Sequence, residues 1–139
     1  MKISIITVSF NCVSTIQDTI DSIQAQSFEN IEHIIVDGGS TDGTLDVIEL
    51  NHDKVSKLLI ETDKGIYDAM NKGIRLATGE IIGLLNSDDV YCSEYIVSKV
   101  ANAFSEYNDE LEAGSHSSVL YLSSFHSALA WVVIVFFLI

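Results

Sequence analysis

The sequence predicts an α/β protein with a doubly wound, mostly parallel β-sheet. Apolar runs of strand length alternate with segments of helical periodicity, and short polar loops rich in Gly, Asn, Asp and Ser connect them. The run at 80–85 is apolar almost throughout, as suits a strand that is buried on both faces of a parallel sheet. Such alternation is typical of doubly wound folds, and a chain of 139 residues makes one domain.

The first half of the chain shows two strand–helix units. Residues 2–8 form the first predicted strand, and a helix is expected over 15–26, with Ser14 and Gln17 as a capping box. Residues 31–36 form a second strand, rich in β-branched residues. This strand runs into Asp37 and the loop GGSTDGT, which opens a further short helix.

The second half continues the alternation. Residues 55–60 form a weaker strand, and apolar residues at helical spacing predict a helix over 65–78 that Gly79 terminates. The strand 80–85 follows. Ser93 is then expected to cap a fourth helix whose apolar face contains Ile96, Val97, Val100, Ala101 and Phe104.

Polar residues follow three of these strands. Right-handed crossovers place the ends of the first, second and fourth strands along one edge, so Asn11, Asp37 and Asp88 are expected to meet there. The adjacent carboxylates of Asp88 and Asp89 would repel each other, and a hard metal ion between them is one interpretation. The other interpretation is a helix N-terminal turn, where Asp and Asn are common caps.

Composition and motifs exclude several functions. A net charge of −13, with seven scattered Lys and Arg residues, argues against a nucleic-acid partner, and a phosphate ligand would need a divalent metal. No P-loop, GxGxxG or GxSxG motif is present. His33, inside an apolar strand, is interpreted as a core residue. Two cysteines without CxxC spacing, and the absence of a signal peptide, predict a cytoplasmic protein.

Four ordered motifs give the chain a family resemblance. They are TVSFN at 7–11, VDGGSTDGT at 36–44, DKGIYDAMNKGI at 63–74 and ATGEIIGLLNSDD at 77–89. Together they resemble the donor half of a family 2 glycosyltransferase, over about residues 2–104, and are most similar to bacterial enzymes that build surface polysaccharides. The resemblance implies the GT-A fold, a Rossmann-like nucleotide-binding domain.

The resemblance also implies roles for individual residues. Val8, Ser9 and Asn11 would pack beside the nucleotide base, Asp37 would accept a hydrogen bond from a uracil-type ring, and Lys64 would reach toward the nucleotide. Asn86, Ser87 and Asp88 occupy the Asp-x-Asp motif, in which the last acid binds Mn²⁺ or Mg²⁺ on the diphosphate. Asp89 either orients Asp88 or a water molecule without binding the metal itself, or it caps the next turn.

The carboxyl-terminal part departs from the family pattern. The family places its catalytic base downstream, and nothing around Asp109, Glu110 or Glu112 resembles that motif. One hypothesis is therefore a metal-dependent, inverting transfer of sugar from a UDP-linked donor to a glycan or lipid-linked acceptor hydroxyl in polysaccharide biosynthesis. The alternative is a truncated, inactive nucleotide- and metal-binding module that lacks the acceptor site and the base.

The predicted organisation is a donor-binding half-domain over 1–106 and an atypical apolar tail over 107–139. Residues 118–139 end in AWVVIVFFLI, but serines dilute the first half of the segment and no Lys or Arg flanks it. Three interpretations stay open, namely a membrane anchor, a buried or aggregated tail, and a non-native reading frame. An anchor would place the protein at the cytoplasmic face of the inner membrane.

Overall fold

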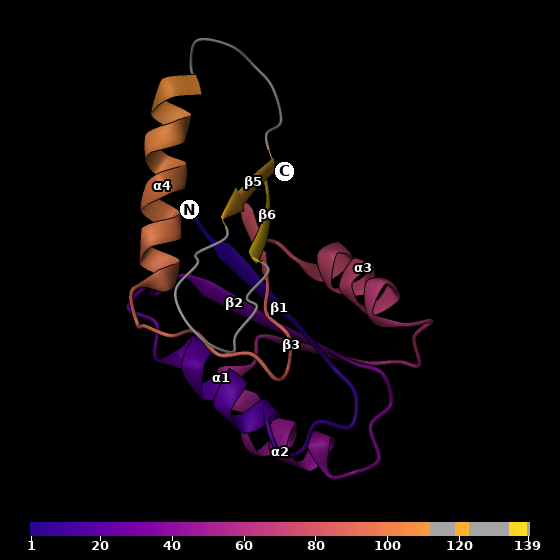
Figure 1. Cartoon of the computed structure of the whole chain (residues 1–139). Helices are drawn as coiled ribbons and strands as arrows, with labels where there is room; N and C mark the ends of the chain where they lie inside the picture. Colours follow the sequence, from indigo (N-terminus) through magenta and orange to yellow (C-terminus); the bar gives the residue numbers. More distant parts are fainter. Residues whose placement is uncertain (112–118, 123–133, 139) are drawn as a thin grey trace.

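The structure is a computed structural model that describes the backbone of residues 1–111, 119–122 and 134–138 and the side chains of residues 1–105. Within these residues, one sheet has the strand order β3-β2-β1-β4-β6-β5. The strands are β1 (Ile3–Ser9), β2 (Ile31–Asp37), β3 (Lys57–Ile60), β4 (Ile81–Leu84), β5 (Val119–Leu122) and β6 (Ile134–Leu138). The helices are α1 (Ile16–Gln24), α2 (Thr44–Leu50), α3 (Ile66–Leu76) and α4 (Ile96–Leu111), and they flank the sheet (Figure 1).

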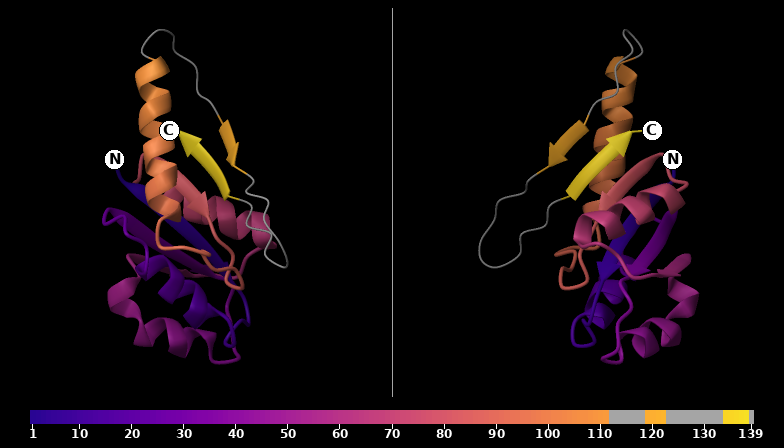
Figure 2. Two further views of the ribbon diagram at one scale, coloured as in Figure 1. Left: turned by 60° about the vertical axis from the view of Figure 1, so that its left-hand side comes forward. Right: turned by 90° about the vertical axis from the view of Figure 1, so that its right-hand side faces the viewer.

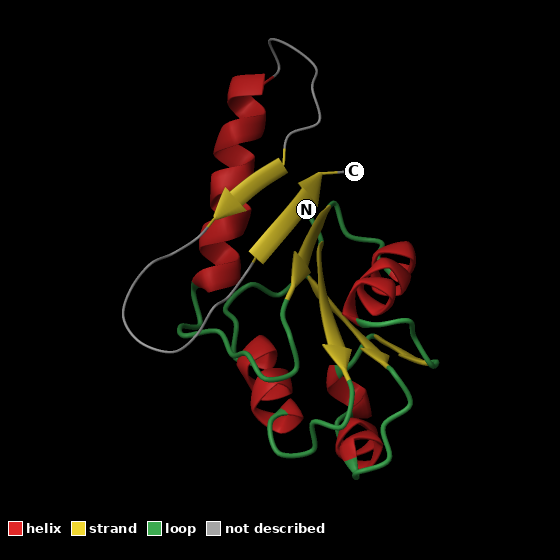
Figure 3. Cartoon of the chain, turned by 45° about the vertical axis from the view of Figure 1, so that its right-hand side comes forward, coloured by secondary structure: helices red, strands yellow, loops and turns green. Residues whose placement is uncertain are grey.

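The four amino-terminal strands confirm the predicted parallel, doubly wound sheet. β1 pairs in parallel with both β2 and β4, and β2 pairs in parallel with β3. The register sets Ser9 opposite Asp37, so the first two strands end at the same level. Figure 3 shows the arrowheads of β1, β2 and β3 pointing to one edge, where their connecting loops gather. The edge expected for a ligand is therefore formed as predicted.

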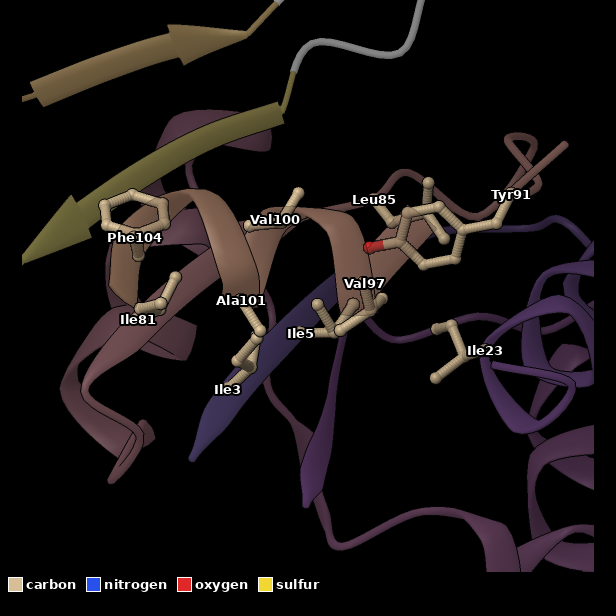
Figure 4. Close-up of a cluster of buried hydrophobic side chains, with 10 residues drawn as sticks. All are labelled: Ile3, Ile5, Ile23, Ile81, Leu85, Tyr91, Val97, Val100, Ala101 and Phe104. Carbon is tan, nitrogen blue, oxygen red and sulfur yellow. The ribbon is translucent and has the colours of Figure 1, made fainter. Parts of the chain in front are cut away.

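Side chains alternate between two faces of the sheet, and each face has its own helices. Even-numbered residues of β1 pack under α3, in a cluster with Ile34, Val36, Ala69 and Ile82. The opposite face carries α1, α2 and α4. There α4 lays Val97, Val100, Ala101 and Phe104 against Ile3, Ile5 and Ile81 (Figure 4). At about 25 cal/mol per Å² of buried apolar surface, this two-sided burial is the main stabilising contribution to the fold.

Two local predictions about helix ends were wrong. The Ser14–Gln17 capping box does not form, because α1 has Thr15 at its N-cap without a side-chain cap bond, and the Gln17 amide instead contacts Asp21 and Asn51. Gly79 does not terminate α3, which ends at Leu76. A side chain on Gly79 would lie 2.6 Å from the Ser4 backbone nitrogen, so the glycine permits a close approach to β1.

The amino-terminal edge of the sheet is held by Glu32, which is 4% exposed. The carboxylate accepts hydrogen bonds from the Ser4 hydroxyl over 2.6 Å and from the Thr78 backbone N–H over 2.8 Å, and it forms ion pairs with Lys2 and Lys57. Burial opposes ionisation of Glu32, but these hydrogen bonds outweigh it and hold the pKa of the carboxyl far below its ordinary value. This cluster fixes the segment between α3 and β4 to β1 and β2.

The apolar tail takes part in the sheet. β6 pairs antiparallel with β4, setting Ile81 opposite Leu138, and β5 pairs antiparallel with β6 (Figure 2). The short β3 is the outermost strand on the side of the sheet away from β5, and its Leu58 and Ile60 side chains are exposed. α4 crosses the predicted boundary at residue 106. None of the described helices has the length and apolar character needed to cross a bilayer. The remainder of the predicted 118–139 segment lies outside the described residues.

Candidate functional site

Asp37, the last residue of β2, is fully buried and accepts four hydrogen bonds. The backbone N–H groups of Gly39 and Ser40 donate to Oδ1 over 2.9 and 2.7 Å. The hydroxyl groups of Ser9 and Ser40 donate to Oδ2 over 2.8 and 2.7 Å. A carboxylate offers about four lone-pair positions, so the acceptor capacity of Asp37 is fully used in tying β1 to the loop after β2.

Asn11 joins this cluster from the turn after β1. Its φ of 49° lies in the left-handed region, which Asn tolerates better than most residues. The Asn11 backbone N–H donates to the Ser40 hydroxyl oxygen over 2.8 Å, and its side-chain oxygen accepts the Thr41 N–H over 2.9 Å. The structure thus brings Ser9, Asn11 and Asp37 together, as the sequence predicted for two of the three strand ends.

Sequence reasoning missed two residues beside this cluster, Phe10 in the turn after β1 and Asp63 in the loop after β3. A side chain on Gly38 would lie 2.8 Å from Asp63 Oδ2 and 3.2 Å from the Phe10 ring, so both residues flank the Asp37 cluster. The Phe10 ring is 62% exposed, which leaves it available for stacking. Asp63 had a signal in the sequence, since it follows the end of a strand as Asp37 does.

The other predicted residues nearby have different surroundings. Lys64 is exposed beside Asp63, and its backbone N–H donates to the Asp68 carboxylate over 3.1 Å at the start of α3. Val8 is 9% exposed and packs in the core under α3 with Val36 and Ala69. The Val8 side chain is therefore part of the hydrophobic core between the sheet and α3, whereas Lys64 faces solvent.

The acidic loop, residues 86–89, follows β4. The Asp89 N–H donates to the Asn86 carbonyl over 3.1 Å, and the Asn86 side-chain amide donates to Asp89 Oδ2 over 3.3 Å. Ser87 is buried, Asp89 is half-buried and Asp88 is exposed. Burial, followed by the negative charge of Asp88, raises the pKa of Asp89, and the Asn86 amide offsets part of this increase.

Capping does not explain these acids. α4 begins at Ile96, well beyond the acidic loop, and the Ser93 hydroxyl accepts the Tyr95 N–H over 3.3 Å at its start, as predicted for a cap. Among the described residues, no backbone N–H donates to the carboxylates of Asp88 or Asp89. The second interpretation of the sequence, a helix N-terminal turn, thus has no supporting contact here.

The donor set of the acidic loop fits a hard divalent cation. Asp88, Asp89 and Asn86 supply carboxylate and amide oxygens, which Mg²⁺ and Mn²⁺ prefer, and Asp88 is exposed to an incoming ligand. In the part of the chain with described side chains, no three His, Cys, Asp or Glu residues form a metal-binding group. A metal held here would therefore take further oxygen ligands from the substrate or from water, which is usual for Mg²⁺ beside phosphates.

The fold and this edge define a doubly wound α/β protein of GT-A type, and comparisons with known proteins identify the family. The sequence model of Glycosyl transferase family 2 matches residues 4–120. A PGL/p-HBAD biosynthesis glycosyltransferase of Mycobacterium bovis is 37% identical over 107 residues, which are 75% of this chain and 42% of that protein. An uncharacterised glycosyltransferase of a Nostoc species is 40% identical over 95 residues. The chain belongs to glycosyl transferase family 2.

Solved structures agree with this assignment. S. aureus TarS 1–349 in complex with UDP-GlcNAc has a TM-score of 0.75 at 25% identity, covering 87% of this chain and 34% of TarS. The mannosyltransferase PcManGT from Pyrobaculum calidifontis, in complex with GDP-Man and Mn²⁺, has a TM-score of 0.67 at 26% identity, covering 72% of this chain and 31% of that protein. The chain thus spans only about a third of these structures, and 42% of its mycobacterial relative.

Proposed function

We propose that this chain is the donor-binding part of a glycosyltransferase that takes a sugar from a nucleotide diphosphate donor. The observation that supports this most directly is that the Asp37 cluster, Phe10 and the acidic loop each follow the carboxyl end of a parallel strand, where ligands bind in such sheets. In this proposal the acceptor is a hydroxyl of a glycan or lipid-linked molecule. The protein is cytoplasmic, and residues 118–139 would provide any association with the membrane.

In this proposal the base lies beside the Asp37 cluster, and the donor is UDP-linked. Phe10 offers an exposed ring for stacking. A ring N–H that approaches Asp37 would have to replace one of its four present donors. The hydroxyl groups of Ser9 and Ser40 can rotate away, whereas the backbone N–H groups cannot. Base recognition is therefore coupled to a hydroxyl rotation. Lys64 would contribute its charge at the rim of this site.

The diphosphate lies at the acidic loop in this proposal. Asp88 would bind Mn²⁺ or Mg²⁺, and the chemistry that the metal supplies is stabilisation of the negative charge that develops on the departing diphosphate. Asn86 and Ser87 provide neutral hydrogen-bonding groups toward the donor, and Asp89 acts as an outer partner of Asp88. The proposed transfer is inverting, and its catalytic base is a residue that we do not assign.

The test is a thermal shift titration with UDP, in the presence and absence of Mn²⁺. UDP should raise the melting temperature only with Mn²⁺, and Asp88→Ala should abolish the shift. Asp53→Ala, which removes an exposed acid from the 3₁₀ turn His52–Lys54, is the matched control and should preserve the shift. An undiminished shift in Asp88→Ala would reject the metal assignment, and a preference for GDP over UDP would reject the uridine assignment.

The alternative to sugar transfer is donor binding without transfer. Incubation with UDP-GlcNAc and Mn²⁺, with release of UDP as the readout, separates the two. Release of UDP supports a transferase or donor hydrolase. A Mn²⁺-dependent UDP shift without any release of UDP from the sugar donor supports the binding module.

A further inference from the structure

Side chains of α1, together with Gln26 just beyond its end, hold the segment that follows β4. The Thr19 hydroxyl donates to the carbonyl of Asp89 over 2.9 Å. The Ser22 hydroxyl oxygen accepts the backbone N–H of Tyr91 over 3.2 Å. The Gln26 side chain donates to the Ser93 carbonyl over 2.9 Å and accepts the Val97 N–H over 3.1 Å. These contacts join residues about 70 positions apart in the sequence.

The three polar residues form one stripe. Thr19, Ser22 and Gln26 are spaced by three and four positions, which places them on the same side of α1 and just beyond its end. Thr19 is fully buried and Gln26 is 9% exposed, so they do not belong to a solvated face. Buried polar groups of this kind are hydrogen-bonded, and here their partners are backbone groups of an irregular segment.

The acidic loop has few other hydrogen bonds to the rest of the described residues after the end of β4. Leu85 N–H still bonds to the Ile6 carbonyl, and the turn from Asn86 to Asp89 closes on itself. The next described hydrogen bond from this segment to another element is the one from Thr19. The carbonyl that it holds belongs to Asp89, the residue after Asp88, so this bond restrains the backbone next to Asp88.

We propose that the α1 polar stripe, Thr19, Ser22 and Gln26, positions the acidic loop for metal binding. Its members are positioning residues, because they act on Asp88 through the backbone and do not touch the ligand. This inference rests on the proposed role of Asp88. Outer partners that orient metal ligands typically change metal affinity by about 10–100-fold when they are removed. Thr19→Val, which keeps the shape but loses the donor, should weaken Mn²⁺ binding by about tenfold.

The experiment measures the Mn²⁺ concentration that gives half of the maximal UDP-induced thermal shift, in the full chain. Thr19→Val should raise this concentration about tenfold, and Thr19→Ser, which restores the hydroxyl, should return it to within about twofold of the wild type. Thr78→Val is the matched control, because it makes the same substitution at a hydroxyl bonded to Glu32 over 2.9 Å on the opposite edge of the sheet. It should leave the Mn²⁺ dependence unchanged.

The outcomes separate this inference from the proposed function. Absence of a Mn²⁺-dependent UDP shift in the wild type rejects the proposed function itself. A normal wild type, together with an unchanged Mn²⁺ midpoint in Thr19→Val, rejects the positioning role alone. If Thr19→Val does not fold, Ser22→Ala gives the same comparison, because it removes the acceptor of the Tyr91 N–H, and an unchanged midpoint in that variant also rejects the role.

Discussion

Asp37→Asn tests whether the buried carboxylate holds the carboxyl edge together. The substitution preserves Oδ1, which accepts the N–H groups of Gly39 and Ser40, but replaces Oδ2 with an amide that cannot accept the hydroxyl protons of Ser9 and Ser40. Ser9 can turn and accept from the new amide. The Ser40 oxygen already accepts the Asn11 N–H, so it has less freedom to do so.

The expected loss follows from these contacts. Two hydrogen bonds to a charged group contribute about 1.5–3 kcal/mol each, and one neutral bond regained at Ser9 returns about 1 kcal/mol. The free energy of unfolding should therefore fall by about 3 kcal/mol, a large part of the 5–15 kcal/mol typical of a domain. Urea denaturation followed by far-UV circular dichroism at neutral pH measures this difference directly.

Asp42→Asn is the matched comparison. Asp42 also accepts several hydrogen bonds, from Val13 N–H and from the N–H and hydroxyl of Thr44, but it is exposed and lies just before α2. The amide oxygen of Asn can keep both Thr44 contacts and water can replace the bond from Val13, so the loss should be much smaller than that of Asp37→Asn. Equal losses in the two variants, or a wild-type stability for Asp37→Asn, would contradict the idea that the buried carboxylate organises this edge.

Two further predictions concern buried groups on the body of the sheet. Glu32→Gln should cost about 2 kcal/mol at pH 7, because Lys2 and Lys57 lose their partner. Since the folded-state pKa of Glu32 is depressed, this difference should shrink as the pH falls below 4.5, and a pH-independent difference would contradict it. Burial lowers the pKa of His33 to about 4. Between pH 4 and 6.5 the unfolded chain binds more protons at His33, so stability should rise with pH by about 3 kcal/mol. His33→Gln should flatten this part of the urea-derived stability profile.

Strand positions and the edge at which the strands end could be predicted from sequence. Apolar runs located β1, β2 and β4, and the right-handedness of crossovers then placed Asp37 and Asn11 at one edge. His33 was correctly expected in the core. Of its two ring nitrogens, Nε2 lies 3.0 Å from the Thr7 hydroxyl, and among the described residues Nδ1 has no hydrogen-bond partner. These features follow from short-range periodicity, which a single sequence contains.

Contacts between distant segments could not be predicted. Gly79 resembles a helix C-cap in sequence, and only the proximity of the Ser4 backbone reveals its role. Thr19 lies among polar residues that look like a solvated helix face. Its hydrogen-bond partner is a carbonyl 70 positions away, and nothing in the local sequence indicates that contact. The antiparallel pairing of β6 with β4 is likewise invisible to periodicity, because an apolar segment of that length suits several environments.

The two sides of α1 have a consequence for how this protein can evolve. Ile16, Ile20 and Ile23 fix the helix to the sheet, while Thr19 and its neighbours in the polar stripe bind the segment after β4. A substitution that turns or shifts the helix therefore alters core packing and loop geometry together. Positions 19, 22 and 26 should consequently covary with positions 89–97 among relatives, so that the acidic loop and the helix are inherited as one unit.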